Sequence, residues 1–109
     1  MIKAVIFYKG GYITGFNVEG HAGYADEGYD IYCAGISAIT QTALIGLLKH
    51  LKVKPEYTIE KGDLKVKLPT VLDEEDRDKA QIILSTMEAG LVSLEDAYKH
   101  YFSLERRRC

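Results

Sequence analysis

The chain has 109 residues, 47% hydrophobic and 28% charged, which is typical of one soluble globular domain and excludes a disordered or low-complexity chain. A formal net charge of -2 excludes a global attraction to nucleic acid or anionic lipid, so any contact with a polyanion has to be local. Neither the number nor the spacing of the cysteines, Cys33 and Cys109, suggests a disulfide framework or a zinc site. The N-terminal residues do not have the pattern of a secretory signal. We therefore expect a cytoplasmic protein without metal or cofactor.

The N-terminal residues predict a β-hairpin followed by a long loop. Residues 2–8 and 12–18 are rich in β-branched and aromatic side chains, and the glycine pair between them suits a tight turn. Residues 20–32 contain three glycines and little apolar periodicity, so we expect an extended, mobile loop there. A loop of that length in a compact domain usually has a function.

Helical spacing of apolar residues begins after this loop. Apolar side chains recur every three or four positions from Ile36 to Leu51, while Ser37, Thr40 and Gln41 supply a polar side. The stretch 31–48 carries no charge and approaches the length of a membrane span, but its polar residues and glycines favour a helix buried inside a protein.

The second half of the chain predicts a second hairpin and a second helix. Residues 56–61 and 63–68 alternate in hydrophobicity about Gly62-Asp63, as strands with one solvated face do. Carboxylates at 73–76 suit the first turn of a helix whose apolar stripe continues to Phe102. The sequence leaves open whether this helix is continuous or broken near Gly90.

These elements predict a single α+β domain over residues 1–109, in the order ββαββα. Both helices should pack on one face of an antiparallel sheet. Such a sheet leaves edge strands, and an unpaired edge or an uncovered apolar face is a common place for a homodimer to form.

Cys33 is the first candidate for chemistry, because it follows the glycine-rich loop and precedes the apolar helix. In the first helical turn, unpaired backbone N–H groups and the helix macrodipole would stabilise a thiolate and lower the pKa of the thiol. The N–H groups of Ala34 and Gly35 would then be available as an oxyanion hole. The alternative is that Cys33 is a small, buried and inert residue.

His21 lies twelve positions before Cys33, between Gly20 and Gly23. A histidine within reach of a cysteine at a helix start is the minimum equipment for nucleophilic catalysis, because the imidazole can accept the thiol proton and return it to the leaving amine. The alternative is a surface histidine in a turn. The spacing allows the pairing of His21 with Cys33 but does not require it.

Other side chains of this segment have two interpretations each. Asp30 would either orient the imidazole, as the third member of a triad, or cap the helix. Ser37, one helical turn after Cys33, could form a hydrogen bond within the site or be merely tolerated. The loop tyrosines, Tyr24, Tyr29 and Tyr32, could pack against a substrate or anchor the loop.

The motif Gly20-His21-Ala22-Gly23, followed by GYDIYCAGISA at residues 28–38, resembles the paired signature of the ribosomal-processing cysteine proteases, the Prp family. The two halves occur in the order and at the distance of that family, and the whole chain is compatible with it, although Tyr32 stands where a smaller aliphatic residue is expected. The resemblance implies a homodimeric endopeptidase that removes a short N-terminal extension from a protein of the large ribosomal subunit. It implies that His21 and Cys33 are catalytic and that Gly20, Asp30 and Ser37 support geometry or substrate binding, while residues 22–32 move to admit a peptide.

Two other functions compete with this interpretation. A group of lysines between residues 49 and 67, or the arginines at 106–108, could contact rRNA in a non-enzymatic ribosome-assembly module, although acidic residues interrupt the lysines. A low-pKa Cys33 could also serve as a redox-sensing thiol. No other cysteine is near it in the sequence, which makes the redox function a minor alternative.

Overall fold

The computed structural model describes residues 2–20, 27–60, 62–97, 99 and 101–108, and for residues 27–30 it describes the backbone alone. Within these residues the elements follow in the order ββαββαβ. They are β1 (Ile2–Lys9), β2 (Tyr12–Glu19), α1 (Glu27–His50), β3 (Glu56–Glu60), β4 (Asp63–Lys67), α2 (Glu74–Ala97) and β5 (Phe102–Arg108).

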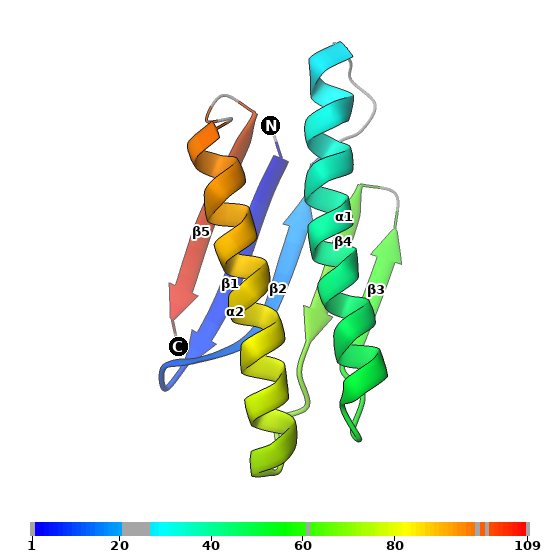
Figure 1. The fold of residues 1–109 in the computed structure, drawn as a ribbon, viewed down its shortest axis with the longest axis vertical. Helices are drawn as coiled ribbons and strands as arrows, with labels where there is room; N and C mark the ends of the chain where they lie inside the picture. Colours follow the sequence, from blue (N-terminus) through cyan, green and yellow to red (C-terminus); the bar gives the residue numbers. More distant parts are fainter. Residues whose placement is uncertain (1, 21–26, 61, 98, 100, 109) are drawn as a thin grey trace.

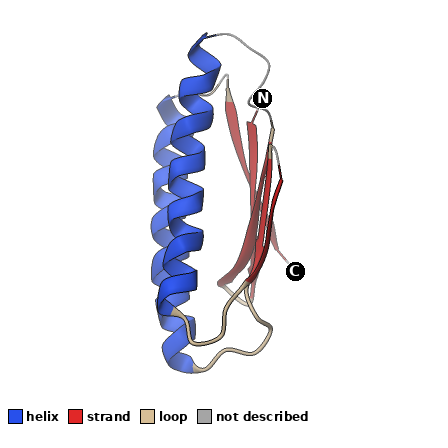
Figure 2. Ribbon diagram, turned by 90° about the vertical axis from the view of Figure 1, so that its right-hand side faces the viewer, coloured by secondary structure: helices blue, strands red, loops and turns tan. Residues whose placement is uncertain are grey.

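The strands form one mixed sheet in the order β3-β4-β2-β1-β5 (Figure 1). The first four strands pair antiparallel to their neighbours, whereas β5 runs parallel to β1. Both helices lie on one face of the sheet and leave the other face open (Figure 2). The structure therefore confirms the α+β class and the position of the helices, and it adds one parallel strand to the predicted antiparallel sheet.

The C-terminal region differs from the sequence prediction. Helix α2 is continuous past Gly90, where Ile39 of α1 packs at 3.6 Å from the position that a Cβ atom would take. Phe102, which we expected at the end of the helical stripe, begins β5 and is 1% exposed. The prediction was wrong here because a strand that pairs with the distant N-terminus carries no local signal that distinguishes it from another helical turn.

Helix α1 begins earlier than predicted. Its first residue is Glu27, so residues 27–32, which we expected in the loop, are helical, and residues 21–26 lie outside the described residues. Thr40 is also buried rather than on a polar side. Its hydroxyl donates to the carbonyl of Ile36 at 2.8 Å. This hydrogen bond within the helix offsets the cost of burying the hydroxyl.

The core lies between the helices and the sheet. Apolar stripes of α1 and α2 pack against the inward side chains of the central strands, and the fully buried members include Ile6, Phe16, Leu47, Leu84, Leu91 and Phe102. Residues Ile31–His50 of α1 are long and apolar enough to span a membrane, but this is weak evidence because a core helix passes the same test. In this fold one face of α1 packs into the core through Ile36, Leu44 and Leu47.

The junction between the helices is held by two aspartates. Asp73 caps α2 by accepting the backbone N–H of Asp76 at 2.8 Å. Asp76, 1% exposed, accepts the backbone N–H groups of Lys52 at 3.0 Å and Val53 at 3.2 Å. The acidic first turn predicted for this helix therefore also holds the residues that directly follow α1.

Candidate active site

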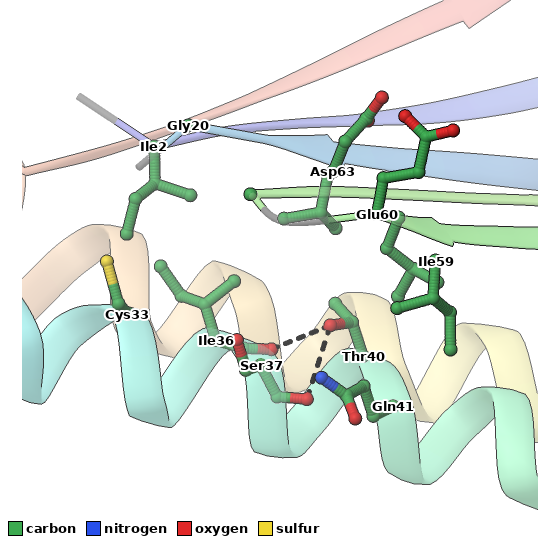
Figure 3. Close-up of a pocket in the computed structure, with 13 residues that line it drawn as sticks. Ile2, Gly20, Cys33, Ile36, Ser37, Thr40, Gln41, Ile59, Glu60 and Asp63 are labelled. Atoms are coloured by element: carbon green, nitrogen blue, oxygen red, sulfur yellow. Dashed lines mark hydrogen bonds between the residues drawn. The ribbon is translucent and has the colours of Figure 1, made fainter. Parts of the chain in front are cut away.

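Cys33 lies in the second turn of α1 and is half-buried. Its side chain points from the helix toward the sheet, near Ile2 (Figure 3). It lines a cavity of about 130 Å³ between α1 and the strands. From α1 the cavity wall also takes Ile36, Ser37, Thr40 and Gln41, and from the strands and their turns it takes Ile2, Val18, Gly20, Ile59, Glu60, Gly62, Asp63 and Leu64.

Gly20 brings the end of β2 to this cavity. Its backbone N–H donates to the carbonyl of Gly62 at 3.1 Å, which continues the β2–β4 pairing by one step beyond Glu19. The φ of Gly20 is 129°, a region that side chains with a Cβ atom rarely adopt. The chain thus leaves the sheet on the cavity wall, directly before His21, which itself lies outside the described residues, as does Tyr24.

Cys33 lies further into the helix than we expected, so the helix end contributes less to the activation of its thiol. Since α1 begins at Glu27, the N–H groups of Ala34 and Gly35 donate within the helix and are not available as an oxyanion hole. Gly35 also faces α2, where Leu94 lies 3.9 Å from the position of a Cβ atom. The macrodipole acts mainly within the first turn, so a proton acceptor is needed for much of the thiol activation.

The other predicted residues separate into two groups. Ser37 lines the cavity with Cys33, which confirms that the two residues share a face of α1. Asp30 and Tyr29 belong to the first turn of α1, so the prediction that Asp30 is the N-cap is wrong, because a cap precedes the first helical residue. Their side chains are not described, and the orienting role of Asp30 stays a prediction.

Tyr32 has a structural partner. Its ring stacks on that of Tyr101, with 4.5 Å between the ring centroids and 24° between their planes. This contact joins α1 to the connection between α2 and β5. For Tyr32 the structure therefore favours the anchoring interpretation over substrate contact.

Sequence reasoning missed the contribution of the β3–β4 hairpin to the site. Ile59 and Glu60 line the cavity because β4 pairs with β2 and brings the hairpin beside α1. Alternation in the sequence predicted the hairpin, but no local signal shows which strand it adjoins. The carboxylates of Glu60 and Asp63 point to the side of the sheet away from Cys33 (Figure 3).

Some of the basic residues that could contact rRNA are paired with carboxylates in the described part of the chain. Lys52 pairs with Asp73, and Lys65 lies 3.8 Å from Asp63. Arg106 contacts Glu88 of α2, whereas the next residue, Arg107, contacts Glu105. Charges that are individually paired with carboxylates attract a polyanion weakly.

Comparison with known proteins links this arrangement to a protease family. The chain matches the family described as Cysteine protease Prp over residues 1–103. The ribosomal processing cysteine protease Prp of Bacillus subtilis is 33% identical over 89 residues, which is 80% of either chain. The protein of the same name from Staphylococcus aureus strain Mu50 is 31% identical over 97 residues, 86% of this chain and 87% of the relative.

Solved structures share the fold over nearly the whole chain. The essential ribosomal processing protease Prp of Staphylococcus aureus, in complex with a substrate peptide, superposes with a TM-score of 0.86 at 25% identity, over 98% of this chain and 100% of the other. SMU.848 from Streptococcus mutans superposes with a TM-score of 0.88 at 19% identity, over 100% and 99% of the two chains. The latter likeness concerns the fold alone.

Proposed function

The chain belongs to the Prp family of cysteine proteases, and from that premise we propose that it removes a short N-terminal extension from a protein of the large ribosomal subunit. In this proposal the Cys33 thiolate is the nucleophile and His21 is the general base and acid. The observation that carries it is the cavity shared by Cys33 and Gly20, the residue directly before His21. The names of the relatives, which are ribosomal processing proteases, support the class of substrate.

The proposed reaction has two halves. The Cys33 sulfur attacks a backbone carbonyl carbon while the imidazole of His21 accepts the thiol proton, and that proton then passes to the nitrogen of the leaving amine as the peptide bond breaks. Water, deprotonated by His21, hydrolyses the thioester and regenerates the thiol. Because Cys33 lies beyond the first turn of α1, we assign most of the thiol activation to His21 rather than to the helix end.

The test uses the ribosomal protein with its extension, from the same organism, as substrate. We expect a shortened product by mass spectrometry, no product with Cys33→Ala, and a rate lowered about 10²- to 10⁴-fold by His21→Ala, the usual contribution of general acid–base catalysis. The matched controls are Cys109→Ala and His50→Ala, which changes an exposed histidine. Both should cleave the substrate at the rate of the wild type. Undiminished cleavage by Cys33→Ala, or none by the wild type, would contradict the proposal.

We propose in addition that the enzyme is a cytoplasmic homodimer. An apolar hollow of about 650 Å³ lies between α1 and α2 and is lined in part by Ile39, Ile82 and Ile83. Ile82 is 68% exposed, and a second copy of the chain would bury it. Sedimentation should give the mass of a dimer for the wild type and of a monomer for Ile82→Glu, and a monomeric wild type would exclude this proposal.

Binding of rRNA is the alternative, and the pairing of Lys52, Arg106 and Arg107 with carboxylates argues against it. If the protein were an assembly module, its affinity for rRNA would fall with salt and survive both Cys33→Ala and His21→Ala. We expect no such affinity in filter binding.

A further inference from the structure

Strand β3 is a free edge beside the site. Among the described strands it pairs with β4 alone, and all five of its residues are exposed. An unpaired edge presents a row of backbone donors and acceptors that another extended chain can complete. The register of the sheet shows which of these groups are available.

Two hydrogen bonds fix the alternation of the ladder. The N–H of Gly20 donates to the carbonyl of Gly62 at 3.1 Å, and the N–H of Leu68 donates to the carbonyl of Thr14 at 2.9 Å. Even-numbered residues of β4 therefore direct their backbone groups toward β2, and odd-numbered residues direct theirs toward β3. The residues of β3 opposite these odd-numbered ones are Glu56, Thr58 and Glu60, so the N–H and C=O groups of Tyr57 and Ile59 face the free edge.

The side chains of the same two residues point toward the helix layer. Tyr57 and Ile59 lie opposite Val66 and Leu64, which belong to the core. They are nevertheless 46% and 57% exposed, because β3 extends past the cover that α1 provides. Ile59 also lines the cavity of Cys33, so a residue of the free edge forms part of the cavity wall.

We propose that a peptide substrate binds as an added strand along the free edge of β3, hydrogen-bonded to the backbone of Tyr57 and Ile59, and enters the cavity of Cys33 where β3 ends. This inference rests on the proposed function and adds the binding mode of its substrate. An extended peptide satisfies the unpaired backbone groups and covers both half-exposed side chains. A second copy of the chain would satisfy the same edge, but it would also obstruct the entrance to the cavity.

The register also predicts the character of the bound segment. Alternate residues of an added strand would lie beside Tyr57 and Ile59 on the helix side, where apolar side chains are favoured. The intervening residues would lie beside Glu60, which stands opposite another carboxylate, Asp63. Because Glu60 is exposed and its carboxylate lies on this face (Figure 3), a lysine or arginine at an intervening position would be favoured.

The test is a backbone scan of a synthetic peptide that contains the ribosomal extension and the first residues of the mature protein. Binding to the Cys33→Ala protein is measured by calorimetry, so that affinity is read without turnover. N-methylation at every second position should weaken binding about fivefold, the effect of one lost hydrogen bond, and methylation at the positions between should have little effect. Equal effects at all positions, no effect, or no binding of the peptide would overturn the inference.

Variants of Ile59 test the protein side. Proline at this position removes the N–H that faces the edge without removing a bond to β4. Ile59→Pro should therefore raise KM about fivefold, the effect of one lost hydrogen bond, while Ile59→Ala, which keeps the N–H, reports the side chain alone. If both variants melt normally and Ile59→Pro cleaves like Ile59→Ala, the inference fails, whereas the proposed function fails if the wild type does not cut or if Cys33→Ala cuts like the wild type.

Discussion

At the scale of single residues, the site depends on how the chain leaves β2. Gly20 forms the last hydrogen bond to the β3–β4 turn and adopts a φ of 129° on the wall of the cavity. In our proposal the backbone conformation of Gly20 determines where the next residue, His21, is placed relative to the cavity. A change of backbone conformation at Gly20 should therefore affect catalysis as well as stability.

We predict that Gly20→Ala lowers kcat/KM at least tenfold while it costs about 1–3 kcal/mol of folding free energy, the usual strain of such a conformation. Gly10→Ala is the matched control, because Gly10 also has positive φ, 59°, but stands in an open turn away from the site. Peptide-cleavage kinetics and urea unfolding would measure both effects. Equal kcat/KM in the two variants would show that Gly20 has no special role in catalysis.

At the scale of elements, the start of α2 is an electrostatic junction. The hydrogen bond from Lys52 and the backbone N–H of Asp76 hold the pKa of Asp73 below its ordinary value of 3.8. The folded state therefore favours the ionised carboxylate. Its contribution to stability is fully present above the ordinary pKa and is lost as the pH falls through the lower pKa of the folded state.

We therefore predict that acidification lowers the stability of Asp73→Asn less than that of the wild type. Asparagine still caps the helix but has no charge to lose, so the difference in urea midpoint between pH 6 and pH 3 should be smaller in the variant, since Asp titrates near pH ~4. Asp78→Asn, at an exposed position of the same helix, should keep the acid dependence of the wild type. Identical profiles for the wild type and Asp73→Asn would refute the role of this junction.

Local patterns predicted the two hairpins and the existence of both helices, because an element with one buried face has apolar residues at regular intervals. The predictions failed where a segment has no buried face. The first turns of α1 rise beyond the strands (Figure 1), and Ile31 is 71% exposed, so no apolar period marks the true start at Glu27. For the site, the shared helical face of Cys33 and Ser37 was predictable, whereas Ile59 joined it through strand pairing that the sequence does not show.

At the scale of the whole molecule, β5 closes the fold. It pairs in parallel with β1 from Ile2↔Phe102 to Tyr8↔Arg108. Tyr8 and Arg106 both form hydrogen bonds to the carboxylate of Glu88 in α2. The pKa of Tyr8 is raised, mainly by burial and in second place by its hydrogen bond to Glu88. The last strand thus holds the N-terminal hairpin and the second helix together.

We predict that Phe102→Ala destabilises the protein by about 3–5 kcal/mol, the usual cost of removing a buried phenylalanine side chain. The neighbouring Ser103→Ala, at a half-buried position of β5, should change stability by no more than about 0.5 kcal/mol. Thermal unfolding of both variants measures this difference. A Phe102→Ala protein as stable as the wild type would mean that β5 is dispensable.

In the proposed mechanism His21, more than the end of α1, activates Cys33. The most direct measurement is the pH dependence of alkylation of Cys33 in the wild type, in His21→Ala and in His50→Ala. We predict a thiol pKa below the ordinary value of about 8.5 in the wild type and in His50→Ala, and a return toward that value in His21→Ala. A low pKa that survives His21→Ala, or an ordinary pKa in the wild type, would contradict the claim.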